Sequence, residues 1–197
     1  MVGAPRWGFH QLDPSWAERV VARAGVRRGD LVLDVGAGFG ALTAPLVDAG
    51  ARVIAVELHP QRAASLRERF GSRVVVVRAD AHDLRLPRAP YKVVANPPFD
   101  ATAAILKRVL QRGSRLQSAH VVVKEQQARR WAAPDAPGAQ RWQREFVVDV
   151  GPRLPRQASR PTPPCNARLL SLYRVVPTNT ARMPRPMMNR PNAPYQR

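Results

Sequence analysis

The chain has 197 residues, enough for one domain with a complete core and too few for two large domains. It carries 32 basic and 14 acidic residues, a net charge of +18, and 29 of the basic residues are arginine. This excess predicts a polyanionic partner, and we expect a nucleic acid rather than a membrane surface because arginine suits phosphate contacts.

The cysteine content and the hydropathy of the chain indicate its compartment. Cys165 is the single cysteine of the sequence, which excludes an internal disulfide framework and fits a reducing environment. No apolar stretch reaches membrane-spanning length, and the first residues lack the apolar segment of a signal peptide. We therefore expect a cytoplasmic protein, acting as a monomer.

Apolar runs and chain breakers predict alternating helices and strands. Asp13 and Pro14 mark the start of the first helix, as its cap and its first-turn residue. Further helices are predicted over 41–49, from 60 to about 70 and over 101–111. Strands are predicted over 31–35, 52–57, 74–77, 91–95 and 118–124, with 146–150 and 169–176 as a closing pair. Strands separated by such helices are typical of βαβ units, so the predicted class is α/β with a largely parallel sheet.

Segment 132–140 contains two prolines and Gly138 and is predicted to be a mobile surface loop. It is flanked by arginines and tryptophans: Arg129, Arg130, Trp131, Arg141 and Trp142. One interpretation is an RNA-contact loop, with arginine on phosphate and tryptophan stacked on bases. The other is an ordinary loop whose tryptophans anchor it in the core, and the sequence leaves both open.

Segment 177–197 is rich in proline and arginine and has no acidic residue. Such a composition cannot bury a core, so we predict a disordered tail after a single domain over 1–176. Arg182 and Arg185 are candidates for contacts with RNA phosphates, although a passive tail fits the composition nearly as well.

The turn after strand 31–35 has the pattern of an adenosine-binding site. Gly36, Gly38 and Gly40 let the backbone turn sharply and approach a ligand. Glu57 ends the next strand, 21 residues after Gly36, where a carboxylate can accept both hydroxyls of a ribose. Asp80 follows the third strand and can accept a hydrogen bond from an adenine amino group, or can cap the turn that follows it.

The stretch Asn96-Pro97-Pro98-Phe99 follows the predicted strand 91–95. It therefore lies at the carboxyl edge of the sheet, where open α/β folds bind ligands. An amide that accepts hydrogen bonds from an exocyclic amine, beside a ring that stacks on a base, suits methylation of a nucleobase nitrogen. A strand-ending turn with a core phenylalanine is the alternative.

These motifs together resemble the ribosomal RNA adenine N6-methyltransferases, and most closely the erythromycin-resistance branch. The similarity is carried by Asp34-Val35-Gly36-Ala37-Gly38-Phe39-Gly40, Val56-Glu57, Ala79-Asp80-Ala81 and Asn96-Pro97-Pro98-Phe99. It implies the class I S-adenosylmethionine-dependent methyltransferase fold, Rossmann-like, with seven strands, helices on both faces and an antiparallel last strand. It also implies N6-methylation of an adenine in the peptidyl-transferase region of 23S rRNA, with macrolide-class resistance as the result.

The resemblance assigns roles to particular residues. Asn96, Pro97 and Phe99 correspond to the catalytic motif. Contacts with the S-adenosyl-L-methionine donor are implied for His10, Leu12, Gly36, Ala37, Gly38, Glu57, Leu58, Asp80, Ala81 and Asn96. The amino-terminal signature departs from the family, because Phe9-His10-Gln11-Leu12 lacks the usual asparagine. We also expect the small helical domain that usually follows the sheet in this family to be absent.

Several alternatives remain at this point. The same chemistry can serve 16S rRNA or DNA, and the fold can serve a non-catalytic RNA-binding module. A nicotinamide-dependent oxidoreductase is disfavoured because no catalytic Tyr-Lys or His-acid constellation is seen. His59 and His82 have no metal-ligand spacing with other residues, so no metal site is predicted.

Overall fold

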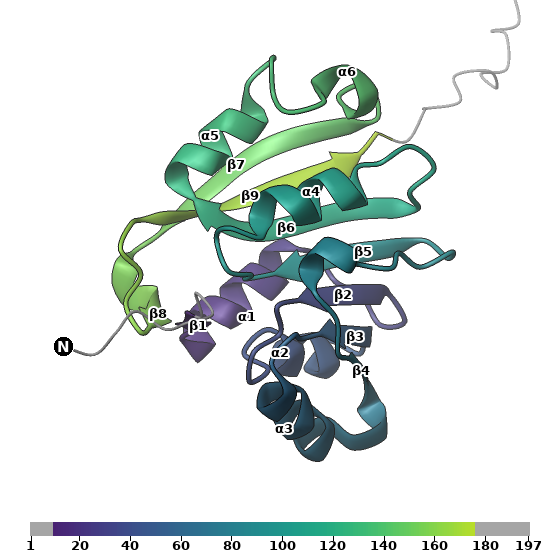
Figure 1. Ribbon diagram of the computed structural model, residues 1–197, viewed down its shortest axis with the longest axis vertical. Coiled ribbons are helices and arrows are strands. Elements are labelled where there is room, and N and C mark those ends of the chain that lie inside the picture. The colour runs from purple at the N-terminus through teal and green to yellow at the C-terminus, as the bar shows by residue number, and fades with distance from the viewer. Residues whose placement is uncertain (1–9, 176–197) are drawn as a thin grey trace, which may run out of the picture.

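The computed structural model describes residues 10–175, which form a central sheet between two layers of helices (Figure 1). The sheet has seven strands: β2 (Leu31–Val35), β3 (Arg52–Val56), β4 (Val74–Val77), β5 (Tyr91–Ala95), β6 (Leu116–Lys124), β7 (Phe146–Leu154) and β9 (Ala167–Arg174). Their order is β4-β3-β2-β5-β6-β9-β7. β9 is antiparallel to both of its neighbours, and the other pairs are parallel. The predicted α/β class, with seven strands and an antiparallel last strand, is confirmed.

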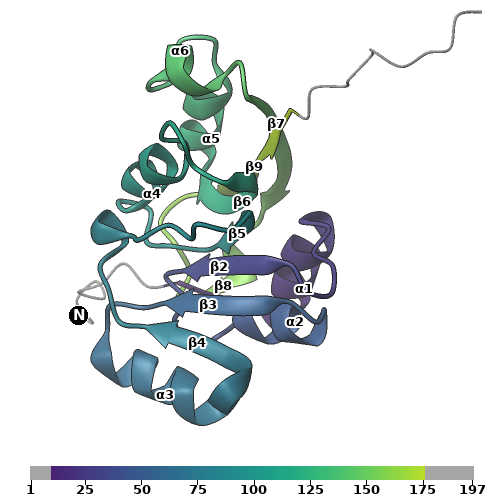
Figure 2. The same ribbon diagram turned by 90° about the vertical axis from the view of Figure 1, so that its right-hand side faces the viewer.

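Helices cover both faces of the sheet, as Figure 2 shows. α1 (Pro14–Arg23), α2 (Thr43–Asp48) and α3 (Pro60–Phe70) pack on one face, against Val32, Val53 and Val122 among others. α4 (Thr102–Val109), α5 (Glu125–Ala132) and α6 (Ala139–Trp142) pack on the other. Strands between two helical layers need apolar side chains on both faces, which explains the near-continuous apolar runs of β2 and β5. The described helices include none with the length and apolarity of a membrane span.

Local sequence signals set most element boundaries. Asp13 caps α1, because its Oδ1 accepts a hydrogen bond from the Ser15 backbone at 3.0 Å. The bounds of β2, α3, β4 and β5 agree with the predicted ones. α2 begins at Thr43, two residues later than expected, because the Gly40 amide donates to the Ala37 carbonyl and closes a turn first.

The last strands and two helices differ from the prediction. β7 continues to Leu154 through Pro152, with a change of register between Val150 and Arg153. A proline is tolerated there because β7 is an edge strand and one of its sides needs no donor. α5 occupies a segment for which no helix was predicted, and α6 occupies part of the expected surface loop.

A second, small sheet joins distant parts of the chain. β1 (Gln11–Leu12) pairs antiparallel with β8 (Ser159–Arg160), in the connection between β7 and β9. Three short 3-10 helices complete the described elements, at Gly71–Arg73, Ala81–Asp83 and Arg156–Ala158. Neither β1 nor β8 was expected from the sequence.

Candidate active site

A cavity of about 230 Å³ opens at the carboxyl edge of the parallel strands. Its walls come from the ends of β2, β3, β4 and β5, as was predicted from the order of the motifs. The lining residues are His10, Gly36, Val56, Glu57, Leu58, His59, Arg62, Ala79, Asp80, Ala81, His82, Asn96, Pro98, Asp100 and Ala101. A smaller cavity of about 20 Å³ shares His10, Gly36 and Asn96 with it and is also lined by Asp34, Leu12 and Ala37.

The glycine turn after β2 is in close contact with the Asn96–Phe99 stretch. Gly36 has φ of 76°, a conformation that residues with a side chain rarely adopt. A β-carbon on Gly36 would lie 3.1 Å from the α-carbon of Pro97. The two motifs therefore pack backbone to backbone, and glycine at position 36 permits this close approach.

Glu57 is held by the glycine turn and still lines the cavity. Its side chain is buried, one oxygen accepts a hydrogen bond from the Gly38 amide at 2.8 Å, and the other accepts one from the His59 amide at 2.8 Å. Arg62 approaches the carboxylate at 3.7 Å. A carboxylate has about four acceptor sites, so two remain for ligand hydroxyls. Gly38 itself lines neither cavity, because its amide faces Glu57.

Asp80 caps the turn that follows β4 and also lines the cavity. Its Oδ1 accepts from the His82 amide at 2.9 Å and pairs with His82 Nδ1 at 2.7 Å, so it caps the turn. These contacts hold the pKa of Asp80 below its ordinary value. The side chain is 43% exposed and lines the cavity, as do the apolar Leu58 and Ala81. Apolar walls with a carboxylate at the rim suit a purine ring that carries an amino group.

The orientation of the Asn96 amide is set by the amino-terminal segment. Asn96 Nδ2 donates to the His10 carbonyl oxygen at 2.7 Å. A carbonyl oxygen can only accept, so this contact identifies the nitrogen end of the amide and leaves Oδ1 as an acceptor for a ligand. His10 is fixed in turn by a hydrogen bond between its Nδ1 and the Pro161 carbonyl at 2.8 Å.

Phe99 is half-buried against the core, lines neither cavity, and has an anchored backbone. Its ring centroid lies 6.0 Å from that of His10, and Lys124 Nζ lies 5.7 Å from it. Gln127 of α5 donates a hydrogen bond to the Phe99 carbonyl at 3.0 Å. Pro97, between Asn96 and Phe99, is buried. Support of this motif by Gln127 was not predicted from the sequence.

Asp34 is a further polar residue that sequence analysis left without a role. Its side chain is buried, Oδ2 accepts from the Thr43 hydroxyl at 2.6 Å, and Oδ1 has no partner among the described residues. Burial raises the pKa of Asp34 to about 7, against the hydrogen bond from Thr43, and the charge of Glu57 raises it further. Its position at the end of β2 was the signal that could have marked it.

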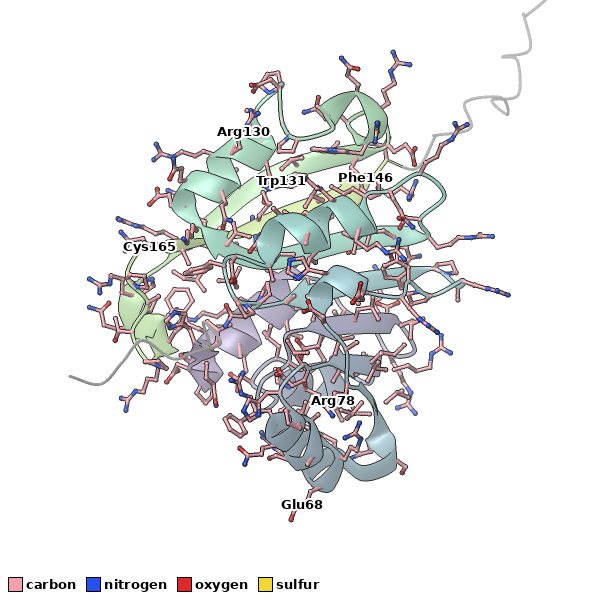
Figure 3. All side chains as sticks on the ribbon, viewed as in Figure 1. Glu68, Arg78, Arg130, Trp131, Phe146 and Cys165 are labelled. Carbon is pink, nitrogen blue, oxygen red and sulfur yellow. The ribbon has the colours of Figure 1, made fainter. Side chains whose placement is uncertain are left out.

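The proposed RNA-contact loop needs a correction. Trp131 and Trp142 are buried, their ring centroids lie 6.0 Å apart, and Trp142 Nε1 donates to the Pro137 carbonyl. Figure 3 shows Trp131 beneath α5 and Arg130 pointing outward. The prediction that these tryptophans stack on bases is therefore wrong, and the alternative, that they anchor the loop in the core, is confirmed.

The arginines of that prediction have separate outcomes. Arg129 pairs with Glu125 at 3.2 Å and Arg130 with Asp135 at 2.8 Å, while Arg141 is exposed on α6. Arg182, Arg185 and the rest of segment 177–197 lie outside the described residues. RNA contacts by all of these arginines stay predictions.

Known proteins are similar to this chain in sequence and in fold. The family described as ribosomal RNA adenine dimethylase matches residues 6–149. The Ribosomal RNA small subunit methyltransferase A of Leifsonia xyli is 37% identical over 62% of this chain and 46% of its own length. An rRNA adenine N-6-methyltransferase of Corynebacterium diphtheriae is 34% identical over 73% of this chain and 58% of its own. The crystal structure of the 23S rRNA methyltransferase ErmE superposes with a TM-score of 0.74, at 26% identity, over 84% of this chain and 70% of ErmE.

The sheet order and the cavity at its carboxyl edge define the class I S-adenosylmethionine-dependent methyltransferase fold. Within that class, the chain belongs to the ribosomal RNA adenine dimethylase family. The chain spans about half the length of the curated relatives it matches.

Proposed function

We propose that this protein transfers a methyl group from S-adenosylmethionine to N6 of an adenine in ribosomal RNA. The observation that carries the proposal is the orientation of Asn96, whose Nδ2 is held by the His10 carbonyl so that Oδ1 remains an acceptor. The adjacent cavity supplies the surroundings that an adenosine-containing donor requires, with Glu57, Leu58 and Asp80 in its wall.

The donor fits these residues by its chemistry. Glu57 has acceptor sites for both ribose hydroxyls, Asp80 has one for the amino group of the donor's adenine, and Leu58 and Ala81 cover the apolar faces of the base. Asp34 Oδ1 is an acceptor for the ammonium group at the amino-acid end of the donor, in the smaller cavity that adjoins the larger one. S-adenosylmethionine supplies an activated methyl group on sulfur, so no covalent enzyme intermediate is needed.

The task of the protein is then to prepare the acceptor nitrogen. The lone pair of adenine N6 is delocalised into the ring and does not point at an incoming methyl group. When Asn96 Oδ1 and the Pro97 carbonyl accept its two hydrogens, N6 can pyramidalise and present the lone pair. Phe99 stacks on the extruded base, a contact worth about 1–3 kcal/mol. Alignment of the reactants supplies most of the rate gain.

For the target, we propose 23S rRNA, with resistance to macrolides, lincosamides and streptogramins as the consequence. The similarity to ErmE over 84% of the chain supports this target. A second candidate is 16S rRNA, which is supported by the higher identity, 37–39%, of the small-subunit methyltransferases from Leifsonia xyli and Mycobacterium tuberculosis over 61–62% of the chain. We expect the protein to act in the cytoplasm.

The test of the activity uses labelled S-adenosylmethionine, purified 16S and 23S rRNA, and duplex DNA as a third substrate. We expect label in adenine of 23S rRNA, and mapping of the modified adenines then names the nucleotide. Label in 16S rRNA alone would favour the second candidate. The absence of transfer to every substrate would favour a non-catalytic RNA-binding module.

The Asn96→Ala variant tests the mechanism. We expect kcat to fall at least about a hundredfold, which corresponds to roughly 2.7 kcal/mol of transition-state stabilisation. The dissociation constant of the donor should change little, because the Glu57 and Asp80 contacts remain. Comparable rates for the variant and the wild type would remove Asn96 from the mechanism.

A further inference from the structure

A second cavity, of about 260 Å³, lies in the connection between β7 and β9 and has no part in the mechanism above. It is lined by Arg153, Pro155, Arg156, Gln157 and Asn166. Two guanidinium groups and two side-chain amides thus line one concave site, and none of these described lining residues is acidic. Such a donor-rich lining suits an anion with several acceptor oxygens.

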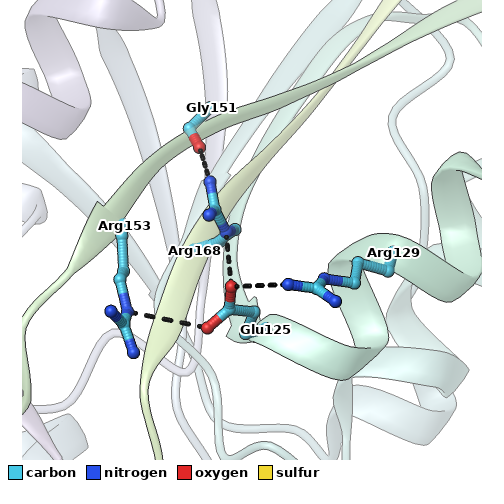
Figure 4. A network of polar contacts seen from close by, with 5 residues as sticks. All are labelled: Glu125, Arg129, Gly151, Arg153 and Arg168. Carbon is cyan, nitrogen blue, oxygen red and sulfur yellow. Dashed lines mark hydrogen bonds and ion pairs between the residues drawn. The ribbon is translucent and has the colours of Figure 1, made fainter.

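The positive charge of this region exceeds its negative charge. Figure 4 shows one carboxylate, that of Glu125, facing three arginines. Glu125 Oε1 lies 3.2 Å from both Arg168 Nε and Arg129 Nη2, and Oε2 lies 3.6 Å from Arg153 Nε. The hydrogen bond from Arg168 holds the pKa of Glu125 below its ordinary value, so the carboxylate stays charged. The Glu125 carboxylate orients the three guanidinium groups, but its single negative charge cannot neutralise their three positive charges.

The guanidinium groups keep donors for a ligand. Each has five N–H donors, and Arg153 and Arg129 use only part of theirs on Glu125. Their side chains are 56% and 74% exposed, so these donors are open to solvent. Arg168 is more buried, at 28% exposure, and also donates to the Gly151 carbonyl, so it serves as the fixed member of the group. Arg156 is exposed and is anchored by a hydrogen bond from its Nε to the Pro163 carbonyl.

The strand directions bring this site to the same edge of the sheet as Asn96. β5 and β6 are parallel, and both β6 and β7 are antiparallel to β9, so β7 runs in the same direction as β5. The carboxyl end of β7 therefore lies at the same edge of the sheet as the candidate active site. Two separate hydrogen bonds connect α5 to the two sites. The Glu125 amide donates to the Asn166 carbonyl, and Gln127, one half-turn further along α5, donates to the Phe99 carbonyl.

We propose that Arg153 and Arg156, with Gln157 and Asn166, bind the phosphodiester backbone of the RNA strand that carries the target adenine. The proposal rests on the proposed function and adds the surface that holds the RNA. Arginine matches phosphate oxygens with paired N–H donors, and contacts of this kind fix the register of a nucleic acid without reading its sequence. Glu125 acts as a positioning residue that holds Arg153 and Arg168 toward the strand.

The test measures binding of a fluorescein-labelled single-stranded RNA oligonucleotide to the full-length protein by anisotropy, over a series of NaCl concentrations. Each phosphate contact contributes about 0.7 to the slope of log affinity against log salt concentration. We expect the double variant Arg153→Ala/Arg156→Ala to bind more weakly and to reduce that slope by about 1.4. The single variant Arg153→Ala should reduce it by about 0.7, with less risk to the fold because this side chain is exposed.

The matched control is Arg112→Ala/Arg115→Ala. Both of these side chains are exposed in the segment before β6, at the opposite edge of the sheet, and the control removes the same charge. If both double variants lose the same amount of salt-dependence slope, RNA is attracted by the overall charge of the protein and the proposal is overturned. An unchanged slope in the variants that lack Arg153 would also overturn it. The donor dissociation constant reports whether each variant is folded. Failure of the wild type to methylate RNA would refute the proposed function while leaving the binding result to stand on its own.

Discussion

Replacement of Asp34 by Asn should change how the stability of the protein depends on pH. The side chain is buried at the end of β2, and its pKa is raised to about 7 from an ordinary value near 3.8. Asn has nearly the same shape, and its carbonyl oxygen can still accept the hydrogen bond from the Thr43 hydroxyl. The substitution therefore removes the ionisation and little else.

The sign of the effect follows from the direction of the pKa shift. As the pH rises from 3.8 toward 7, unfolded chains release the Asp34 proton while folded chains keep it. The free energy of unfolding consequently falls with rising pH, by about 1.36 kcal/mol for each pH unit. Between pH 3.8 and pH 7 the free energy of unfolding of the wild type falls by on the order of 4 kcal/mol. The Asp34→Asn variant does not show this fall.

Urea unfolding of both proteins at about pH 5 and about pH 8 measures the difference. At the lower pH the unfolded wild type has already released the Asp34 proton while the folded wild type keeps it, so the variant should be more stable by about 1.6 kcal/mol. At the higher pH the advantage of the variant should reach about 4 kcal/mol, so the gap between the two proteins widens by roughly 3 kcal/mol. All other titrating groups are common to both proteins and cancel in the comparison. Parallel pH profiles for the two proteins would refute the reasoning.

Two further variants separate donor binding from catalysis. Glu57→Ala should raise the donor dissociation constant at least about tenfold, since a hydrogen bond to a charged group is worth roughly 1.5–3 kcal/mol, and an unchanged constant in calorimetry would contradict the ribose assignment. Gln127→Ala should lower kcat severalfold without weakening donor binding, because the Phe99 backbone loses its anchor. Gln143→Ala is the matched control, because it removes a similar hydrogen bond of 3.0 Å to the Ala133 carbonyl, away from the site. An equal loss of kcat in this control would mean that the Gln127 effect is a general loss of structure.

Much of the sheet could be predicted because its parallel strands are mostly apolar. β4 is a continuous apolar run and β2 and β5 are nearly so, while α3 begins at a proline and ends before Gly71. α5 could not be predicted in the same way, since it buries only Ala128 and Trp131 and its remaining surface is polar. A two-residue pairing between segments about 150 residues apart, as in β1 and β8, leaves no local pattern at all.

The candidate site was predictable where strand direction alone decides position. Glu57, Asp80 and Asn96 end parallel strands and therefore meet at one edge. The orientation of the Asn96 amide was not predictable, because it depends on a backbone carbonyl 86 residues away. The burial of Trp131 and Trp142 likewise depends on how α5 and α6 pack on the sheet, which the flanking arginines in the sequence did not reveal.

The pairing of β1 with β8 has a consequence for the order in which the protein matures during synthesis. His10 is among the first described residues to leave the ribosome, yet its partner Pro161 emerges only after all the parallel strands have been made. A nascent chain can therefore assemble most of its sheet while the wall that aligns Asn96 is still missing. The candidate site is therefore completed only late in translation, once β8 has joined β1.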